Sequence, residues 1–166
     1  GTGIGDLADI LFMPVNKELD LTVKTTSRDQ LPYKSKYSHV NEKATPGSYQ
    51  VFLEDPKINV ELTSSQRTAY HKYTFAKNDK QSVVIDLGFA INWDKALKTG
   101  ITIEDQYTVS GYRYSTGWAK NQKVFFVAVF SKPIKESVLT ADKQIVNTKK
   151  TDGENMAAQL FFDAGN

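Results

Sequence analysis

The sequence contains no cysteine among its 166 residues. Disulfide frameworks, thiol nucleophiles and zinc–thiolate centres are therefore excluded. The same absence does not fix the compartment, because it suits both the cytosol and the bacterial envelope. Histidine is scarce as well, with only His39 and His71. They fall in different predicted elements, and no H-E-x-x-H or EF-hand pattern occurs, so we expect no metal site in this chain.

Long apolar runs and a charge of one sign are also missing. No segment approaches the roughly 20 apolar residues of a spanning helix, so we expect no membrane span. Lysine and arginine total 21 against 19 acidic residues, and only Arg28, Arg67 and Arg113 are arginines. That balance argues against nucleic-acid binding. The opening residues 1–6 also lack the charged and apolar regions of a secretion signal.

Alternation of apolar and polar residues is the main structural signal. Ile58, Val60 and Leu62 alternate with polar residues, which places the apolar set on one face of a strand. The spacing of about ten residues per strand and turn is typical of an all-β sandwich. We therefore predict an antiparallel β-sandwich of two packed sheets with little helix. Further strands are expected at 19–23, 49–53, 71–75 and 83–87, a central strand covered on both faces at 124–130, one helical turn at 93–98, and hairpin turns at 55–56 and 149–153.

The two ends of the sequence carry a separate prediction. The chain opens on the glycine-rich loop 1–5 without a preceding strand, and it closes on an apolar run followed by the turn 163–166. We expect residues 1–166 to form a single β-sandwich domain, incomplete at both ends, from a longer polypeptide.

Motifs for catalysis are not found. Glu54-Asp55 and Glu104-Asp105 are adjacent pairs, whose side chains would point to opposite faces of a strand. Glycosidases need two carboxyl groups facing one substrate, about 5–10 Å apart. The segment 111–117 does not match the G-x-S-x-G nucleophile pattern. We therefore predict no catalytic residue in this chain.

Two residue groups support binding hypotheses. Tyr112 and Trp118 flank Arg113 in a segment with two glycines, and flat aromatic rings suit stacking on the apolar C–H face of a pyranose. The alternative, which we favour on frequency, is a hairpin whose aromatic side chains pack in the core. His39 and Glu42 lie in a polar segment, where hydrogen bonds that organise a loop are favoured over ligand contact.

Several segments, in order and spanning nearly the whole chain, resemble the N-terminal domain of glycoside hydrolase family 92. Residues 1–3 are similar to the end of the family's S-H-x-H-L-S-G-T-G segment, and residues 6–14 to the D-Y-x-D-I-L-x-M-P segment that follows it. Ser48 and Lys72 depart from the usual tyrosine and arginine of the family, and residues 64–66 replace its A-T-x. The other matching segments are Y-S-H with E and P-G-S-Y at 37–49, E-L-T with R and H-K-Y-T-F at 61–75, G-Y-R with G-W at 111–118, and F-S-K-P at 130–133.

The resemblance implies a role within a larger enzyme. The family comprises calcium-dependent exo-α-mannosidases, many from gut Bacteroides, and the resemblance implies hydrolysis of terminal α-mannosides, α-1,2 linkages included, with inversion. Their catalytic carboxylates and calcium ligands lie in a C-terminal α/α-barrel domain. This chain would then be inactive alone, bind no cofactor itself, pack on its own catalytic domain and meet mannose-containing glycans through it. The resemblance further implies a secreted or periplasmic location, and it makes Thr2, Gly3 and Asp6 candidates for the substrate rim.

Two other functions remain open from the sequence. A stand-alone carbohydrate-binding or lectin-like module would use Trp118 and the neighbouring tyrosines for saturable sugar binding. A structural or adhesive envelope domain would bind no sugar. The mannosidase interpretation differs from both because it predicts one unusually apolar surface, where another domain packs.

Overall fold

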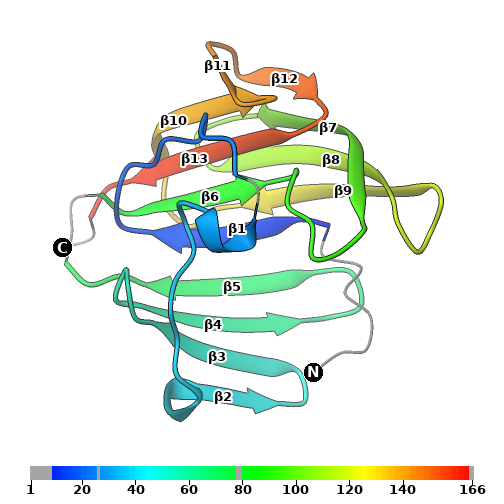
Figure 1. The fold of residues 1–166 in the computed structure, drawn as a ribbon. Helices are drawn as coiled ribbons and strands as arrows, with labels where there is room; N and C mark the ends of the chain where they lie inside the picture. The colour runs from blue at the N-terminus through cyan, green and yellow to red at the C-terminus, as the bar shows by residue number, and fades with distance from the viewer. Residues whose placement is uncertain (1–8, 26, 78–79, 165–166) are drawn as a thin grey trace.

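The computed structural model describes residues 9–25, 27–77 and 80–164, which form thirteen strands and two short 3-10 helices. All strand pairs in these residues are antiparallel. Figure 1 shows the strands as an upper body of two sheets with a third sheet beneath it. The predicted fold class, an antiparallel all-β sandwich with little helix, is confirmed. None of the helices in these residues has the length and apolarity to cross a membrane.

Two sheets pack face to face in the upper body. The five-stranded sheet, here the β6 sheet, has the order β1-β6-β13-β10-β11, and the four-stranded β8 sheet has the order β12-β7-β8-β9. The β6 sheet contains β1 (Leu11–Val15), β6 (Ser82–Asp86), β13 (Met156–Phe162), β10 (Ile134–Ala141) and β11 (Gln144–Val146). The β8 sheet contains β12 (Lys150–Gly153), β7 (Lys95–Ile103), β8 (Thr108–Thr116) and β9 (Gln122–Val129).

The main core lies between these two sheets. Ile85 and Leu160 come from the β6 sheet, and Ile101 and Val109 come from the β8 sheet, and all four are fully buried. Alternating apolar residues on each strand point into this layer, as period-2 patterning requires. The predicted strand at 83–87 is confirmed at β6, although all of its side chains are buried because both of its faces are covered.

The third sheet is a meander in the order β2-β3-β4-β5. Its inner face forms a small core to which Met13 of β1 adds its side chain. The β3–β4 hairpin turns at Asp55-Pro56 as predicted, and Leu53 pairs with Ile58 across it. The strands are β2 (Glu42–Thr45), β3 (Ser48–Leu53), β4 (Ile58–Ser64) and β5 (Ala69–Thr74), and the 3-10 helices η1 (Arg28–Gln30) and η2 (His39–Asn41) precede them.

The segment 16–25 is not the predicted strand. Leu19 and Leu21 are buried, but the segment is an irregular cover over the outer face of the β6 sheet. Gln159, fully buried on β13, fixes it: its Nε2 donates to Lys17 O at 2.7 Å, and its Oε1 accepts from Leu19 N at 3.0 Å. Alternation therefore predicted correctly which side chains are buried. The backbone of this segment, however, is hydrogen-bonded to the Gln159 side chain and not to a neighbouring strand.

Three further predictions were wrong about neighbours in the sheet. The run at 124–130 is not central, because β9 is an edge strand whose alternate residues are exposed. Residues 150–153 are not a hairpin turn but strand β12, which pairs with β7 in the opposite sheet. Residues 93–98 form no helical turn, since β7 begins at Lys95. Each error concerns long-range pairing, which a local pattern does not specify.

Candidate functional site

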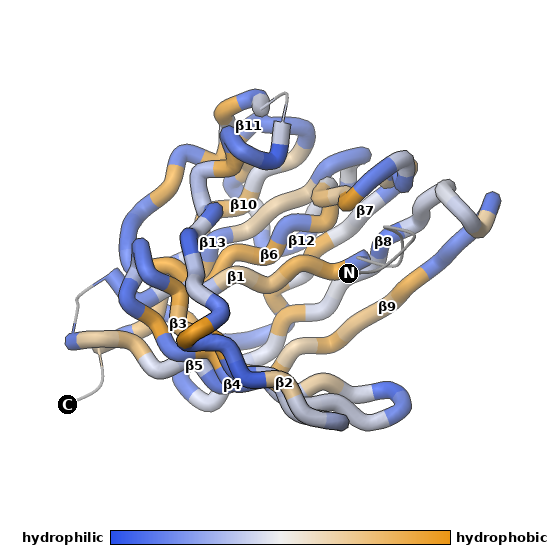
Figure 2. Tube along the Cα trace, turned by 60° about the horizontal axis from the view of Figure 1, so that its bottom comes forward, coloured by the Kyte–Doolittle hydropathy of each residue, from blue (hydrophilic) through white to orange (hydrophobic). Residues whose placement is uncertain are grey.

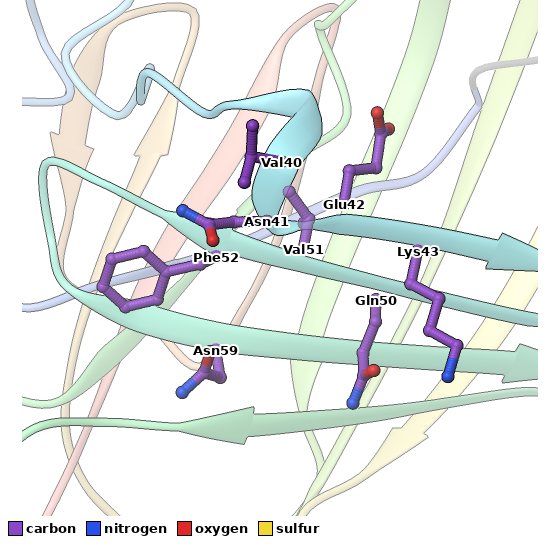
Figure 3. Close-up of a pocket in the computed structure, with 8 residues that line it drawn as sticks. All are labelled: Val40, Asn41, Glu42, Lys43, Gln50, Val51, Phe52 and Asn59. Carbon is purple, nitrogen blue, oxygen red and sulfur yellow. The ribbon is translucent and has the colours of Figure 1, made fainter.

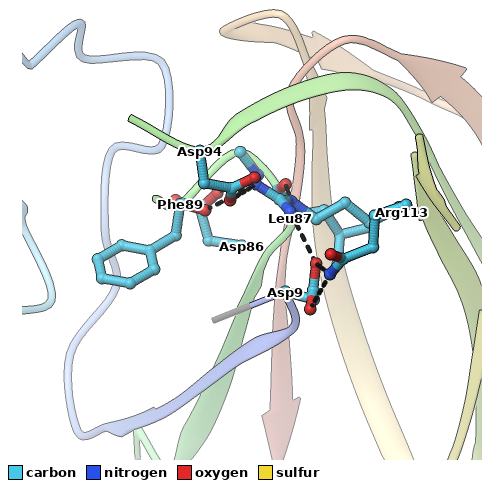
Figure 4. Close-up of polar contacts among 8 residues, drawn as sticks. Asp9, Asp86, Leu87, Phe89, Asp94 and Arg113 are labelled. Carbon is cyan, nitrogen blue, oxygen red and sulfur yellow. Dashed lines mark hydrogen bonds and ion pairs between the residues drawn. The ribbon is translucent and has the colours of Figure 1, made fainter. Parts of the chain in front are cut away.

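Arg113, in the middle of β8, is the largest fully buried side chain in the described residues. Its position between Tyr112 and Tyr114, on the alternate face of the strand, points it inward. Its guanidinium donates from Nε to Leu87 O at 2.9 Å, from Nη1 to Asp9 Oδ1 at 2.9 Å and from Nη2 to Asp94 Oδ2 at 2.5 Å. Figure 4 shows these groups converging on the guanidinium from separate parts of the chain.

Two carboxylates compensate the buried charge. Asp94 is buried, and Asp9 is nearly so and also accepts from Gln122 Nε2 at 2.7 Å on each of its oxygens. A planar guanidinium can bind several acceptors in fixed directions, which a lysine cannot do. Arg113 thereby joins three segments that are distant in sequence: the start of the described chain, the loop 87–94 and the β8–β9 hairpin.

The loop 87–94 is shaped at its start by Asp86. One oxygen of the Asp86 carboxylate accepts from Gly88 N at 2.8 Å, and the other accepts from the Tyr33 hydroxyl at 2.8 Å. Burial, and then the Asp86 charge, raise the pKa of the Tyr33 hydroxyl well above its ordinary value. Tyr33 therefore remains a neutral donor, and the chain leaves β6 in a fixed direction toward Arg113.

Two tryptophans lie beside these anchored loops. A Cβ built on Gly117 would be only 3.2 Å from Asp94 Cα, so the β8–β9 hairpin touches the loop 87–94 at that point. Trp118 follows Gly117, and Trp93 precedes Asp94, with exposed fractions of 70% and 52%. The structure thus presents two exposed indoles from adjoining loops, next to the segment that contains Asp9. We call the loop 87–94, the hairpin loop 117–121 and Asp9 together the loop end.

Tyr112, the other predicted sugar-stacking residue, lies on the outer face of the β8 sheet. Its ring is tilted against Tyr114 at a centroid distance of 4.9 Å and lies near Phe125 at 6.2 Å. Trp118 lies beyond the end of β8, in the hairpin loop. The predicted aromatic group is therefore divided between a sheet face and a loop.

His39 and Glu42 form a hydrogen-bonded group with Tyr49. His39 Nδ1 lies 2.5 Å from Glu42 Oε2, and the Tyr49 hydroxyl donates to Glu42 Oε1 at 2.6 Å. These bonds, that of Tyr49 first, hold the pKa of the Glu42 carboxyl below its ordinary value. Burial and the Glu42 carboxylate raise the pKa of Tyr49 to about 12. These hydrogen bonds tie η2 and β2 to β3.

An open hollow of about 640 Å³ lies beside this group on the third sheet. Figure 3 shows that its side chains are mostly amides and aliphatic groups, with the ring of Phe52 at one end. Glu42 is its only carboxylate among the lining residues, and both oxygens of that carboxylate already accept hydrogen bonds. The hollow therefore lacks the paired carboxyl groups that glycoside hydrolysis requires.

The variant Tyr49→Phe is expected to raise the pKa of Glu42 toward its ordinary value, because it removes the strongest hydrogen bond to the ionised form. A depressed carboxyl pKa adds stability above the pKa of the unfolded chain, and this is lost as the pH falls through the folded pKa. The variant should therefore lose less stability on acidification. An NMR titration of the Glu42 side chain measures the shift, with Tyr70→Phe on β5 as control; an unchanged Glu42 pKa would contradict the assignment.

The remaining predictions concern rim and metal residues. Thr2, Gly3 and Asp6 lie outside the described residues. Among residues 9–25, 27–77 and 80–164, no three His, Asp or Glu side chains gather as a metal site. His71 on β5 is exposed, and its Nδ1 lies 2.7 Å from the Tyr73 hydroxyl.

Sequence reasoning missed the centre of the loop end. Asp94 and Gln122 carried no motif, and Asp9 and Arg113 lay in segments that resemble the family but were given no structural role. The usable signal was weak: a fully buried arginine needs acidic partners, but the strand pattern does not show that Arg113, and not the tyrosines beside it, faces inward. The identity of those partners, up to 104 residues away, could not be obtained from that signal.

Comparisons with known proteins agree with this fold. A family model described as the glycosyl hydrolase family 92 N-terminal domain matches residues 1–166. A family GH92 α-mannosidase from Bacteroides thetaiotaomicron is 32% identical, with a TM-score of 0.88, and the match covers 100% of this chain and 24% of that protein. Its complex with mannoimidazole matches with a TM-score of 0.87, also at 32% identity, over 100% of this chain and 23% of that one.

A more distant solved structure shows the same fold. The GH92 family glycosyl hydrolase ccman5 is 21% identical, with a TM-score of 0.77, over 99% of this chain and 22% of that protein. No curated protein matches the sequence. The chain thus spans about a quarter of the length of the solved structures it resembles.

Proposed function

Because the chain belongs to the glycosyl hydrolase family 92 N-terminal domain family, we propose that it is the non-catalytic β-sandwich domain of an exo-α-mannosidase. The longer enzyme would hydrolyse terminal α-mannosides, including α-1,2 linkages, with calcium and with inversion at the anomeric carbon. The match to an α-mannosidase of Bacteroides thetaiotaomicron over the whole of this chain is the observation that supports the proposal. We further propose a secreted or periplasmic location, with which a chain free of cysteine is compatible.

The chemistry is assigned to the rest of the longer enzyme. An inverting glycosidase uses a carboxylic acid and a carboxylate base about 6.5–9.5 Å apart, with water between the base and the sugar. Asp9 and Asp94, the carboxylates at the loop end, are both held in ion pairs with Arg113. They stabilise the structure, and this proposal gives them neither the role of the acid nor that of the base. The described residues also supply no cluster of oxygen ligands for calcium, so this proposal places no calcium site on them.

The contribution of this chain is to shape one side of the substrate pocket. Arg113 fixes Asp9, which follows the proposed rim residues Thr2, Gly3 and Asp6 by only a few positions. The same arginine fixes Asp94, beside Trp93. The loop end can therefore present the apolar face of Trp118 to a mannose ring while the catalytic domain acts on the glycosidic bond.

An assay of two lengths of polypeptide tests this assignment. The longer protein should release mannose from an α-1,2-linked mannobiose, and residues 1–166 alone should release none. Mannose release by residues 1–166 alone would overturn the proposal, and so would a longer protein that hydrolyses no α-mannoside.

In the longer enzyme, Trp118→Ala is expected to raise KM by about 5- to 30-fold with little change in kcat. The reason is that the lost stacking contact is worth about 1–2 kcal/mol of apolar burial and lies away from the reacting bond. The control is Tyr70→Ala, which removes an equally exposed aromatic ring from the third sheet. Steady-state kinetics with a mannobiose measure KM and kcat of both variants. Equal KM values for the two variants would show that Trp118 does not contact the substrate.

A stand-alone carbohydrate-binding module is the second candidate, favoured by the exposure of Trp118. It predicts saturable binding of mannosides to residues 1–166 alone, lost in Trp118→Ala. Calorimetric titration separates the two functions, because the mannosidase domain needs the catalytic domain to complete its sugar site.

A further inference from the structure

Strand β9 exposes a row of large apolar side chains. Phe125, Val127 and Val129 have exposed fractions of 67%, 69% and 75%. They alternate with Val124, Phe126 and Ala128, which are partly buried toward the core. Figure 2 shows hydrophobic colour along β9, at the margin of the molecule. A strand with one face in the core normally turns polar residues outward.

The neighbouring strand extends this apolar surface. Tyr112 pairs with Phe125 across the sheet, and Tyr114 lies 5.8 Å from Phe125, ring to ring. The Tyr112 ring lies against Gly100 of β7, where an added Cβ would come within 2.4 Å of it. The glycine thus lets the ring spread across the sheet surface. We call the surface of Phe125, Val127, Val129, Tyr112 and Tyr114 the outer β9 face.

Exposure of this kind is unusual for an isolated domain. Edge strands of soluble proteins usually carry charged side chains or proline against unwanted pairing, whereas Lys123 is the only charged residue of β9.

We propose that the outer β9 face is where the catalytic domain of the longer enzyme docks. The proposal rests on the proposed function, and the length of polypeptide outside this chain supports it: the solved relatives are about four times as long. A partner of that size can cover a whole sheet face.

The charges around the face argue against a second copy of this chain as the occupant. Lys98, Lys123 and Lys150 lie at outward register positions of the β8 sheet. Among the described residues, Lys98 is the only one of the three with an ion-pair partner, Asp152 at 3.0 Å. Two copies brought together through this face would oppose like charges. The fitting partner is an apolar surface bordered by carboxylates.

The outer β9 face lies next to the loop end. Beyond Lys123 the outer β9 face continues into the β8–β9 hairpin, which contains Trp118. A domain docked along β9 would therefore border the loop that we assign to the substrate pocket. One docking event then both buries the apolar row and completes the site.

Residues 1–166 contain no cysteine, so a thiol introduced among them can be followed on its own peptide. Val127→Cys and Val129→Cys each place one thiol on the outer β9 face, and Val40→Cys places one on η2, where the side chain is 91% exposed. Labelling of the longer protein with iodoacetamide is followed by peptide mass spectrometry, in native buffer and in urea. Thermal unfolding of each variant confirms that it is folded.

In native buffer, the thiols at 127 and 129 are expected to react on the order of a hundredfold more slowly than the thiol at 40, because a covered thiol reacts only on local opening. All three should react alike in urea. Equal native rates would overturn the docking proposal. Protection of 127 and 129 in residues 1–166 alone, rising with concentration, would also overturn it and assign the face to self-association.

The two proposals fail separately. If the longer protein hydrolyses α-mannosides but its thiol at 127 reacts rapidly, the proposed function stands and the docking face is rejected. If the thiol at 127 is protected but the longer protein hydrolyses no α-mannoside, the docking face stands and the assigned reaction is rejected.

Discussion

The variant Arg113→Met is expected to lower the free energy of unfolding by about 3–5 kcal/mol, the usual effect of removing one partner from a buried ion pair. Methionine fills much of the same volume but leaves the Asp94 carboxylate buried without its charge partner. It also removes the donors to the carbonyl groups of Leu87 and Phe89. Urea unfolding of wild type and variant, followed by tryptophan fluorescence, measures the difference.

Two further variants separate charge from geometry at this position. Lys43→Met is the matched control, because Lys43 is an exposed cation on β2 that forms no ion pair with the described part of the chain. It should change stability little. Arg113→Lys should fall between the two, since it keeps the charge but loses the fork of donors. A loss below about 1 kcal/mol for Arg113→Met would show that the ion pairs do not hold the loop end.

Leu160→Ala is expected to lower the free energy of unfolding by about 2–5 kcal/mol. Leu160 is 0% exposed on β13, in the core between the two packed sheets. The layer is covered on both sides, so the surrounding strands can relax only partly into the cavity. The same urea measurement applies, and the slope of the transition should stay unchanged if only the native state is affected.

Leu97→Ala is the corresponding control, because it makes the same substitution on β7 where the side chain is 49% exposed. It removes less buried area and leaves no closed cavity, so it should destabilise the chain much less. Similar losses for both leucines would mean that the two sheets do not form the main core.

Some strands could be predicted because their side chains alternate and their partners are close in sequence. The β3–β4 hairpin is one case: apolar alternation and Asp55-Pro56 specify both strands and the turn between them. The burial of Leu19 and Leu21 was predictable in the same way. Their backbone conformation was not, because it depends on Gln159, 140 residues further along the chain.

The loop end shows the same division at the candidate site. Trp118 could be singled out as an aromatic residue in a glycine-containing segment, and its exposure agrees with a position outside the core. Trp93 on the adjoining loop could not be found, because the contact between Gly117 and Asp94 joins two loops that the sequence separates by two strands, β7 and β8. The division of Tyr112 from Trp118 likewise depends on where β8 ends.

By itself, the sequence determined the all-β class, the absence of thiol chemistry and the family, because composition, alternation and ordered motifs are properties of the chain. Only the tertiary structure decided that β9 lies at an edge with its apolar residues outward, and that Arg113 gathers Asp9 and Asp94. The physical reason is that a strand pattern fixes which side chains share a face. The choice of neighbour, and with it the burial of a charge or the exposure of an apolar row, is made by pairing between distant segments.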